Sequence, residues 1–150
     1  MKISEHLNLA EITRSETAKR KGISNMPTPE HLENFRKLAE HIFEPIRAHF
    51  NVPIHISSGY RSKELNKAIG GALTSQHCSG EAIDIDMEGS ADGVTNRMIF
   101  DYIEANLSFD QLINEFNYSW VHVSYESTGK QRKQTLRASK SGENTVYSPF

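Results

Sequence analysis

The sequence predicts an α+β domain in which a small antiparallel sheet carries the functional residues and helices flank it. Two observations indicate this class. Apolar residues with helical spacing come first along the chain, and short segments of alternating apolar and polar residues come mostly later. The 150 residues are enough for one domain with a hydrophobic core. We therefore expect a single domain, with a core from about residue 4 to about residue 138 and a polar C-terminal tail.

Composition and charge exclude several classes of protein. A net charge of −2 gives no reason to expect nucleic acid or a membrane surface as partner. The single cysteine excludes an internal disulfide. The N-terminal segment MKISEHLNLA lacks the apolar core of a signal peptide, and no apolar run is long enough to span a bilayer. We expect synthesis in the cytoplasm, no membrane insertion and a monomeric protein.

Helix-capping residues mark the first elements. Asn8, followed by Glu11 at the capping-box position, predicts one short helix. Ser15 predicts the start of a second helix that ends at Gly22.

The longest helix begins after Thr28, a favourable N-cap that precedes a proline. Its buried face is predicted from apolar residues at helical spacing: Leu32, Phe35, Leu38, Ala39, Ile42 and Ile46. Pro45 should kink this helix or end its regular part, because proline lacks the backbone N–H of a helix interior.

Strands and two further helices follow. Ser62 and the Gly70-Gly71 pair bound one short helix, and residues 94–107 have the pattern of an amphipathic one. We expect an edge strand at QTLRA and loosely held residues over the last ten positions. The other strands are predicted at 52–60, 81–87, 109–116 and 120–125.

Alternation within two of these strands brings polar side chains to one face. In EAIDIDM the isoleucines point to one side and Asp84 to the other. In WVHVSY the valines point to one side and His122 to the other. If the two strands are neighbours with their apolar faces on the core, Asp84 and His122 project from the same open face. His77, in the loop before the first strand, could complete a cluster of three.

Two imidazoles and one carboxylate suit one zinc ion, and three protein ligands with an open fourth position are typical of catalytic sites. Hydrolysis also needs a general base, for which Glu115 at the end of the preceding strand is the natural candidate. Spacing alone leaves another interpretation open, in which Asp84 hydrogen-bonds a turn and His122 is an ordinary strand residue. Asp86 and His55 could hydrogen-bond a ligand side chain and so orient it, although a solvated carboxylate is the simpler interpretation of Asp86.

The segments SGYRS, IGG, SQHCSGEAIDID and WVHVSY resemble the zinc D,D-peptidase family M15, most closely its small phage and bacterial members without signal peptides. The family carries an S-x-H-x-x-G-x-A-x-D motif and a later W-x-H or H-x-H motif. The positions that match these motifs are Ser75, His77, Gly80, Ala82, Asp84, Trp120 and His122.

The resemblance implies a set of roles. Zinc ligands fall on His77, Asp84 and His122. The family's catalytic acid often lies three residues before the last histidine, where this chain has Ser119, which cannot act as a base. The related zinc domain of hedgehog signalling proteins places its glutamate further back, which favours Glu115.

Arg61 in SGYRS resembles the arginine that orients the substrate in this family, with local pairing to an acid as the alternative. Ser75, Gln76 and Trp120 are expected to line the substrate cleft.

The function implied by the resemblance is a zinc-dependent hydrolase of peptidoglycan stem peptides or similar peptides with D-residues, acting as a carboxypeptidase or an endopeptidase. A zinc-bearing binding module of the same fold without turnover is the alternative, with the hedgehog-type domain as precedent. The absence of a signal peptide fits a phage lysin, a virion-associated wall enzyme or a cytoplasmic peptidase. The sequence selects neither among these locations nor among the bonds of the stem peptide.

Overall fold

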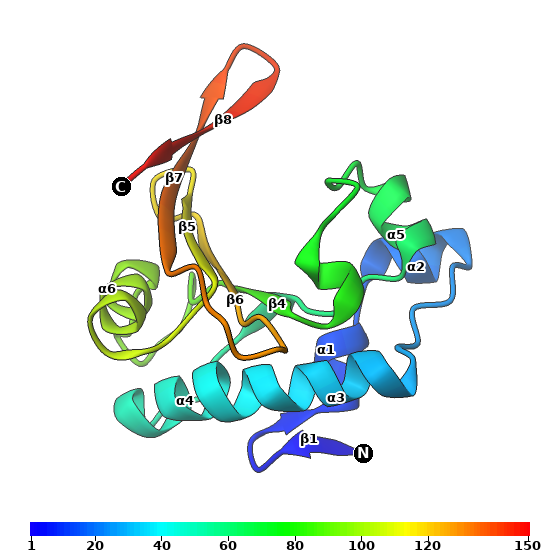
Figure 1. The fold of residues 1–150 in the computed structure, drawn as a ribbon, viewed down its shortest axis with the longest axis horizontal. Coiled ribbons are helices and arrows are strands. Elements are labelled where there is room, and N and C mark those ends of the chain that lie inside the picture. The colour runs from blue at the N-terminus through cyan, green and yellow to red at the C-terminus, as the bar shows by residue number, and fades with distance from the viewer.

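A six-stranded mixed sheet organises the computed structural model, which describes residues 1–150 (Figure 1). The strand order is β3-β4-β6-β5-β7-β8, and a separate hairpin of β1 and β2 lies near the N-terminus. The strands are β1 (Lys2–Ser4), β2 (Leu7–Asn8), β3 (Ile56–Ser58), β4 (Ala82–Ile85), β5 (Gln111–Glu115), β6 (Trp120–Ser124), β7 (Gln134–Ser141) and β8 (Asn144–Pro149).

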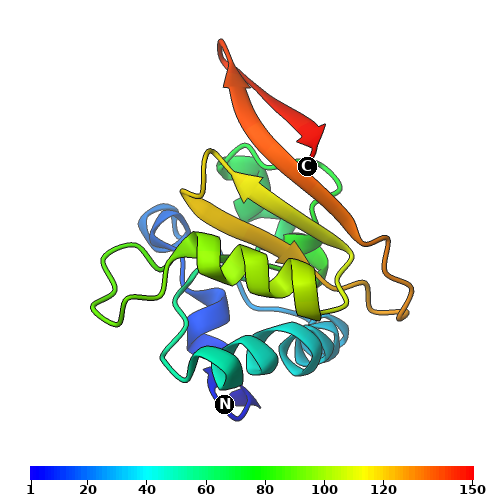
Figure 2. The same cartoon turned by 90° about the vertical axis from the view of Figure 1, so that its left-hand side faces the viewer.

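Helices cover one face of the sheet and border the other. The longer helices α3 and α6 pack with the apolar face of the central strands, whereas α5 stands on the opposite side (Figures 1 and 2). None of the helices combines the length and apolar character that crossing a membrane requires. The helices are α1 (Leu9–Thr13), α2 (Glu16–Lys21), α3 (Pro29–Leu38), the π-helical turn η1 (Ala39–Phe43), α4 (Glu44–Phe50), α5 (Lys63–Ala68), the 3₁₀ turn η2 (Gln76–Ser79) and α6 (Asn96–Asn106).

The predicted helix starts are confirmed. Asn8 forms a complete capping box with Glu11, and the side chains of Ser15, Thr28 and Ser62 each accept a hydrogen bond from the first turn of their helix. Each cap satisfies a backbone N–H that has no partner within the helix.

Pro45 has the expected effect on the long helix. Regular α-helix ends at Leu38, a π-helical turn follows, and α4 resumes with Pro45 in its first turn. The wider turn accommodates the backbone that proline leaves without a hydrogen bond.

The core lies between the sheet and the helices. It contains the inward side chains of the central strands, among them Ile83, Ile85, Val121 and Val123, together with the buried faces of α3 and α6. These residues are the apolar half of the predicted alternation. The α+β class is therefore confirmed, with the site on the opposite face of the same strands.

Two details of the sheet differ from the prediction. The sheet is mixed rather than wholly antiparallel, because β7 pairs in parallel with β5. Strand β6 runs antiparallel to β5. Residues 125–133 then lead the chain to the other side of β5, where β7 runs parallel to β5. The last ten residues, expected to be loosely held, include strand β8, which pairs antiparallel with β7.

A third difference concerns the length of the first strand of the large sheet, which is shorter than predicted. Of the strand expected at 52–60, only Ile56–Ser58 pairs with a neighbour.

Candidate metal centre and its cleft

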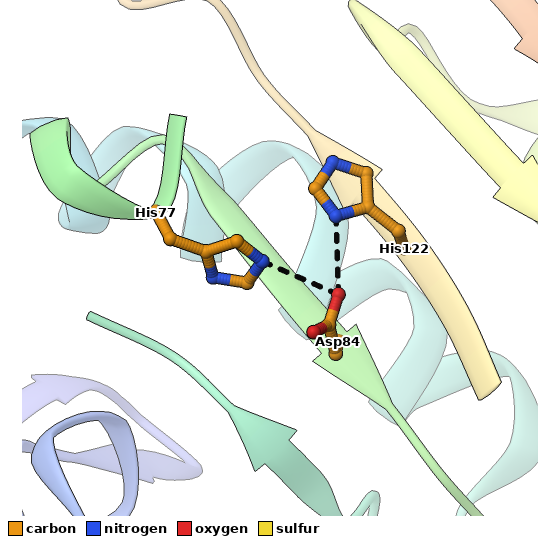
Figure 3. A group of neighbouring side chains, drawn as sticks. All are labelled: His77, Asp84 and His122. Carbon is orange, nitrogen blue, oxygen red and sulfur yellow. Dashed lines mark hydrogen bonds and ion pairs between the residues drawn. The ribbon is translucent and has the colours of Figure 1, made fainter. Parts of the chain in front are cut away.

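Three predicted ligands converge at the centre of the sheet. Asp84 on β4 and His122 on β6 are direct cross-strand partners, so their side chains leave the same face. His77 reaches them from η2 (Figure 3). The Oδ1 atom of Asp84 lies 3.1 Å from Nδ1 of His122 and 3.3 Å from Nε2 of His77. The three candidate ligand atoms lie within 4.8 Å of one another, close enough to bind a single ion.

The loop that carries His77 is shaped by its neighbours in sequence. Ser75 caps η2 by accepting a hydrogen bond from the backbone N–H of His77. Gly80 ends the turn in the left-handed region with a φ of 77°, and a Cβ at this position would overlap the backbone carbonyl oxygen of His31. Glycine is therefore required between His77 and the strand of Asp84, as the motif predicts.

The tautomer that His77 adopts favours a cation at the site. Its Nδ1 donates a hydrogen bond to the carbonyl oxygen of Gly59 at 2.7 Å, which leaves Nε2 with a lone pair. This Nε2 is the only buried side-chain nitrogen or oxygen without a hydrogen-bond partner. It lies 3.3 Å from a carboxylate oxygen of Asp84, which is also an electron-pair donor. Two such donors are held together favourably by a metal ion, and the carbonyl partner on Nδ1 is typical of ligand histidines.

The electrostatics of Asp84 fit a ligand that is ionised. Burial by itself would raise the pKa of this carboxyl, but the neighbouring imidazoles of His77 and His122 outweigh burial and hold the pKa well below its usual range. A zinc ligand must be deprotonated, and Asp84 meets this condition at neutral pH. The donor set of two imidazoles and one carboxylate therefore fits zinc.

Glu115 lies in the cleft beside the three ligands. It is the last residue of β5 and pairs with Trp120, two residues from His122 on β6. Burial raises its pKa from 4.5 to about 6, and the charge of Asp84 acts in the same direction, against His122 and Arg61. Ser119, the alternative position, is exposed in the turn and donates its hydroxyl hydrogen to the carbonyl of Phe116. The geometry therefore favours Glu115 as the base.

Arg61 contacts two of the three candidate metal ligands, Asp84 and His77. Its guanidinium lies 3.4 Å from Oδ2 of Asp84 and donates to Ser58 and Asn66, and its backbone N–H donates to the carbonyl of His77. Arg61 therefore fits both interpretations of its role, since it pairs with an acid and also lines the cleft in which a substrate would bind. Two of its five N–H groups have no partner in the protein.

The cleft has a volume of about 740 Å³ and includes every residue expected at the site: His77, Asp84, His122, Glu115, Arg61, Ser75, Gln76 and Trp120. Gln76 is held by a second cluster, in which its amide donates to Asp110 at 3.0 Å. Arg132 binds the same carboxylate with contacts of 2.8–3.1 Å. The sequence did not indicate this cluster, because strands β5 and β6 separate its two charged members along the chain.

Neither of the two residues that could have oriented a ligand does so. Asp86 does not orient a ligand histidine; its carboxylate accepts hydrogen bonds from the side chain of Asn96 and the backbone of Glu88. His55 is exposed and lies outside the cleft, with Nδ1 3.1 Å from the carbonyl oxygen of Asp86. His55 precedes Ile56, the first residue of β3, and therefore lies outside the paired part of this strand.

Comparison with known proteins agrees with the geometry. The family model described as Peptidase M15 matches residues 5–124, which include all three candidate ligands and Glu115. No curated protein matches the chain. The matched segment covers most of the chain and contains β2 through β6, the part that builds the metal centre. The chain therefore belongs to the peptidase M15 family, whose members are zinc-dependent peptidases.

Proposed function

We propose that this protein is a zinc peptidase that hydrolyses peptidoglycan stem peptides or similar short peptides containing D-residues. The observation that carries the proposal is the unpartnered Nε2 of His77, directed at Asp84 and His122 with Glu115 in the same cleft. The substrate class comes from the family resemblance of the motifs.

Each residue has a role that its environment supports. His77, Asp84 and His122 would hold one zinc ion, which when bound polarises the scissile carbonyl and acidifies water. Glu115 would accept a proton from the attacking water and pass it to the leaving amine. A pKa of about 6 suits both steps, because the carboxylate is available at neutral pH and its conjugate acid still gives up the proton readily.

The other cleft residues would bind the peptide. Arg61 would hold a substrate carbonyl or carboxylate through its free N–H groups. Trp120 would form a wall of the cleft, with Ser75 and Gln76 on the turn that faces it. Gln76 retains a free amide oxygen, since its amide nitrogen donates to Asp110.

The test is mass spectrometry of purified muropeptides after incubation with the zinc-loaded protein. We expect fragments that have gained one water at a peptide bond, and no fragments from His77→Ala. Metal analysis of the same samples shows whether the loss of activity accompanies a loss of zinc. If the zinc-loaded wild type leaves every muropeptide intact, the proposal is refuted.

Glu115→Gln separates the peptidase from a zinc-bearing binding module of the same fold. A peptidase loses at least about 100-fold in turnover and keeps its zinc, because glutamine has no basic carboxylate. A binding module loses nothing measurable.

For location, we propose three alternatives: a phage lysin, a virion-associated wall enzyme, or a cytoplasmic peptidase that acts on recycled wall peptides. Fractionation of infected cells and of purified virions would separate them. Recovery of the protein only from the cytoplasm would select the third alternative and contradict the first two.

A further inference from the structure

The C-terminal hairpin of β7 and β8 forms a wall of the cleft. Five of its residues line the same space as the metal centre: Gln134, Leu136, Lys140, Thr145 and Tyr147. The hairpin extends past the end of β5 on the side opposite α5 (Figure 1). It also lies beyond residue 124, where the match to the peptidase family ends, so the family assignment gives it no role.

The strand register aligns this hairpin with Glu115. Ala138 on β7 is the direct partner of Glu115 on one side and of Tyr147 on the other. Direct partners point to the same face, so Tyr147 and Glu115 share the cleft face with a small methyl group between them. Ala138 is buried, whereas Tyr147 is 54% exposed. Partial burial and then the carboxylates of Glu115 and Asp84 still raise the pKa of its phenol, which agrees with this placement.

Lys140 lies next along the same face, directly opposite Thr145. Its ammonium group is 5.0 Å from the ring centroid of Phe116 and 3.4 Å from Oγ1 of Thr145. Phe116 is also a cleft residue, so the ammonium group of this solvent-exposed side chain lies beside the cleft.

The charge of Lys140 has no carboxylate partner in the protein. The cleft contains two other permanently charged cations, and each is paired: Arg61 with Asp84, and Arg132 with Asp110. Lys140 takes part in no ion pair, although Glu115 lies in the same cleft. The hairpin therefore brings one uncompensated positive charge and two hydroxyl donors to the same wall.

We propose that Lys140, Thr145 and Tyr147 form a subsite for a carboxylate group of the substrate. The inference rests on the proposed peptidase function and specifies what that peptidase recognises beyond the scissile bond. An ammonium group and two hydroxyls provide the hydrogen-bond donors that a carboxylate accepts, and the protein supplies no competing acid. Leu136, the direct partner of Ile113 on β5, adds apolar surface to the same face of the cleft.

The sheet geometry sets how far the carboxylate lies from the scissile bond. Lys140 is one strand and two residues from Glu115, a Cα separation of about 8 Å for ordinary strand spacing and rise. An extended peptide advances about 3.3–3.6 Å per residue. The recognised carboxylate should therefore lie within about two residues of the bond that is cleaved. In a stem peptide two groups qualify, the free C-terminal carboxylate and the α-carboxylate of a γ-linked D-glutamate.

Four synthetic peptides test the subsite and identify the source of the carboxylate. They are the stem pentapeptide ending in D-Ala-D-Ala, its C-terminal amide, its D-isoglutamine analogue, and the peptide with both changes. We expect amidation of one of the two carboxylates to lower kcat/KM of the wild type by about 10- to 100-fold, the range for a lost charged hydrogen bond. The carboxylate whose amidation lowers kcat/KM is the one that the subsite binds.

Lys140→Met provides the decisive comparison. In this variant the same amidation should change kcat/KM by less than about 3-fold, because the charged partner is gone. Lys140→Glu should cleave the sensitive amide faster than the carboxylate peptide, reversing the wild-type preference. Lys130→Met is the matched control, since it removes an exposed lysine that does not line the cleft, and it should retain the wild-type ratio.

Two results would overturn the subsite. One is equal cleavage of all four peptides by the wild type; the other is a penalty for amidation that persists undiminished in Lys140→Met. Either result leaves the peptidase function standing. Failure of the peptidase function is a different observation, in which the zinc-loaded wild type cleaves none of the four peptides, and the subsite falls with it.

Discussion

Replacing Glu115 with glutamine should stabilise the metal-free protein at neutral and higher pH while abolishing its activity. The folded protein buries this carboxyl and raises its pKa from 4.5 to about 6. Above about pH 6 the folded state holds a charged carboxylate that is better solvated in the unfolded chain. A rise of this size corresponds to about 2 kcal/mol of lost stability, at 1.36 kcal/mol for each unit of pKa. Glutamine has nearly the same shape and no charge, so it removes the cost.

The sign of the pH dependence follows from the raised pKa. Below about pH 4.5 the carboxyl is protonated in both states, and Glu115→Gln should have little effect on the free energy of unfolding. As the pH rises through about 6, the free energy of unfolding of the wild type falls by about 2 kcal/mol relative to that of the variant. Urea unfolding of both proteins at about pH 4 and about pH 8, with a chelator present, measures this difference.

The control is Glu104→Gln, which changes an exposed glutamate on α6 and should leave the free energy of unfolding unchanged within about 0.5 kcal/mol. A Glu115→Gln effect of the same size at both pH values would refute the reasoning, because it would show that packing rather than ionisation separates the two proteins.

Three further predictions concern the metal, a glycine and an acid. His122→Ala should lower zinc affinity by at least about 100-fold in competition with a chelator, because it removes a ligand outright. Gly80→Ala should destabilise the fold by about 2 kcal/mol or more, since the new Cβ meets the carbonyl of His31, whereas Gly89→Ala has open space and should cost about 1 kcal/mol by thermal unfolding. Asp110→Ala should lower the free energy of unfolding by about 2 kcal/mol near neutral pH, because it removes the hydrogen bonds of a buried carboxylate. Burial would raise the pKa of Asp110, but its hydrogen bonds hold this pKa below the usual value. Urea unfolding should therefore show the contribution of Asp110 vanish as the pH falls through the lowered pKa.

The metal centre was predictable because its geometry is local to two strands. Strict alternation fixed the faces of Asp84 and His122, and the structure pairs these residues directly. A one-residue slip in either strand would have turned a ligand into the core, so the apolar residues around each ligand specify the register. The caps of the helices were predictable for a similar reason, since each depends on contacts within a few residues.

The parts that escaped prediction depend on contacts across many residues. Asp110 holds Gln76 and Arg132, which lie 34 and 22 residues away, and neither partner has a spacing that indicates the other. The orientation of β7 was equally hidden. Its pattern predicts a strand, but the choice between the two sides of β5 depends on how residues 125–133 return the chain.

The return of the chain has a consequence for the cleft. Asp110 accepts hydrogen bonds from the backbone and side chain of Arg132 just before β7 begins, so this acid fixes where the hairpin joins the sheet. The same carboxylate fixes Gln76, beside the ligand His77. One buried acid therefore sets both walls of the cleft, the turn that carries a metal ligand and the hairpin proposed to bind a carboxylate. Loss of Asp110 should weaken both walls together, whereas loss of Lys140 should affect only the hairpin.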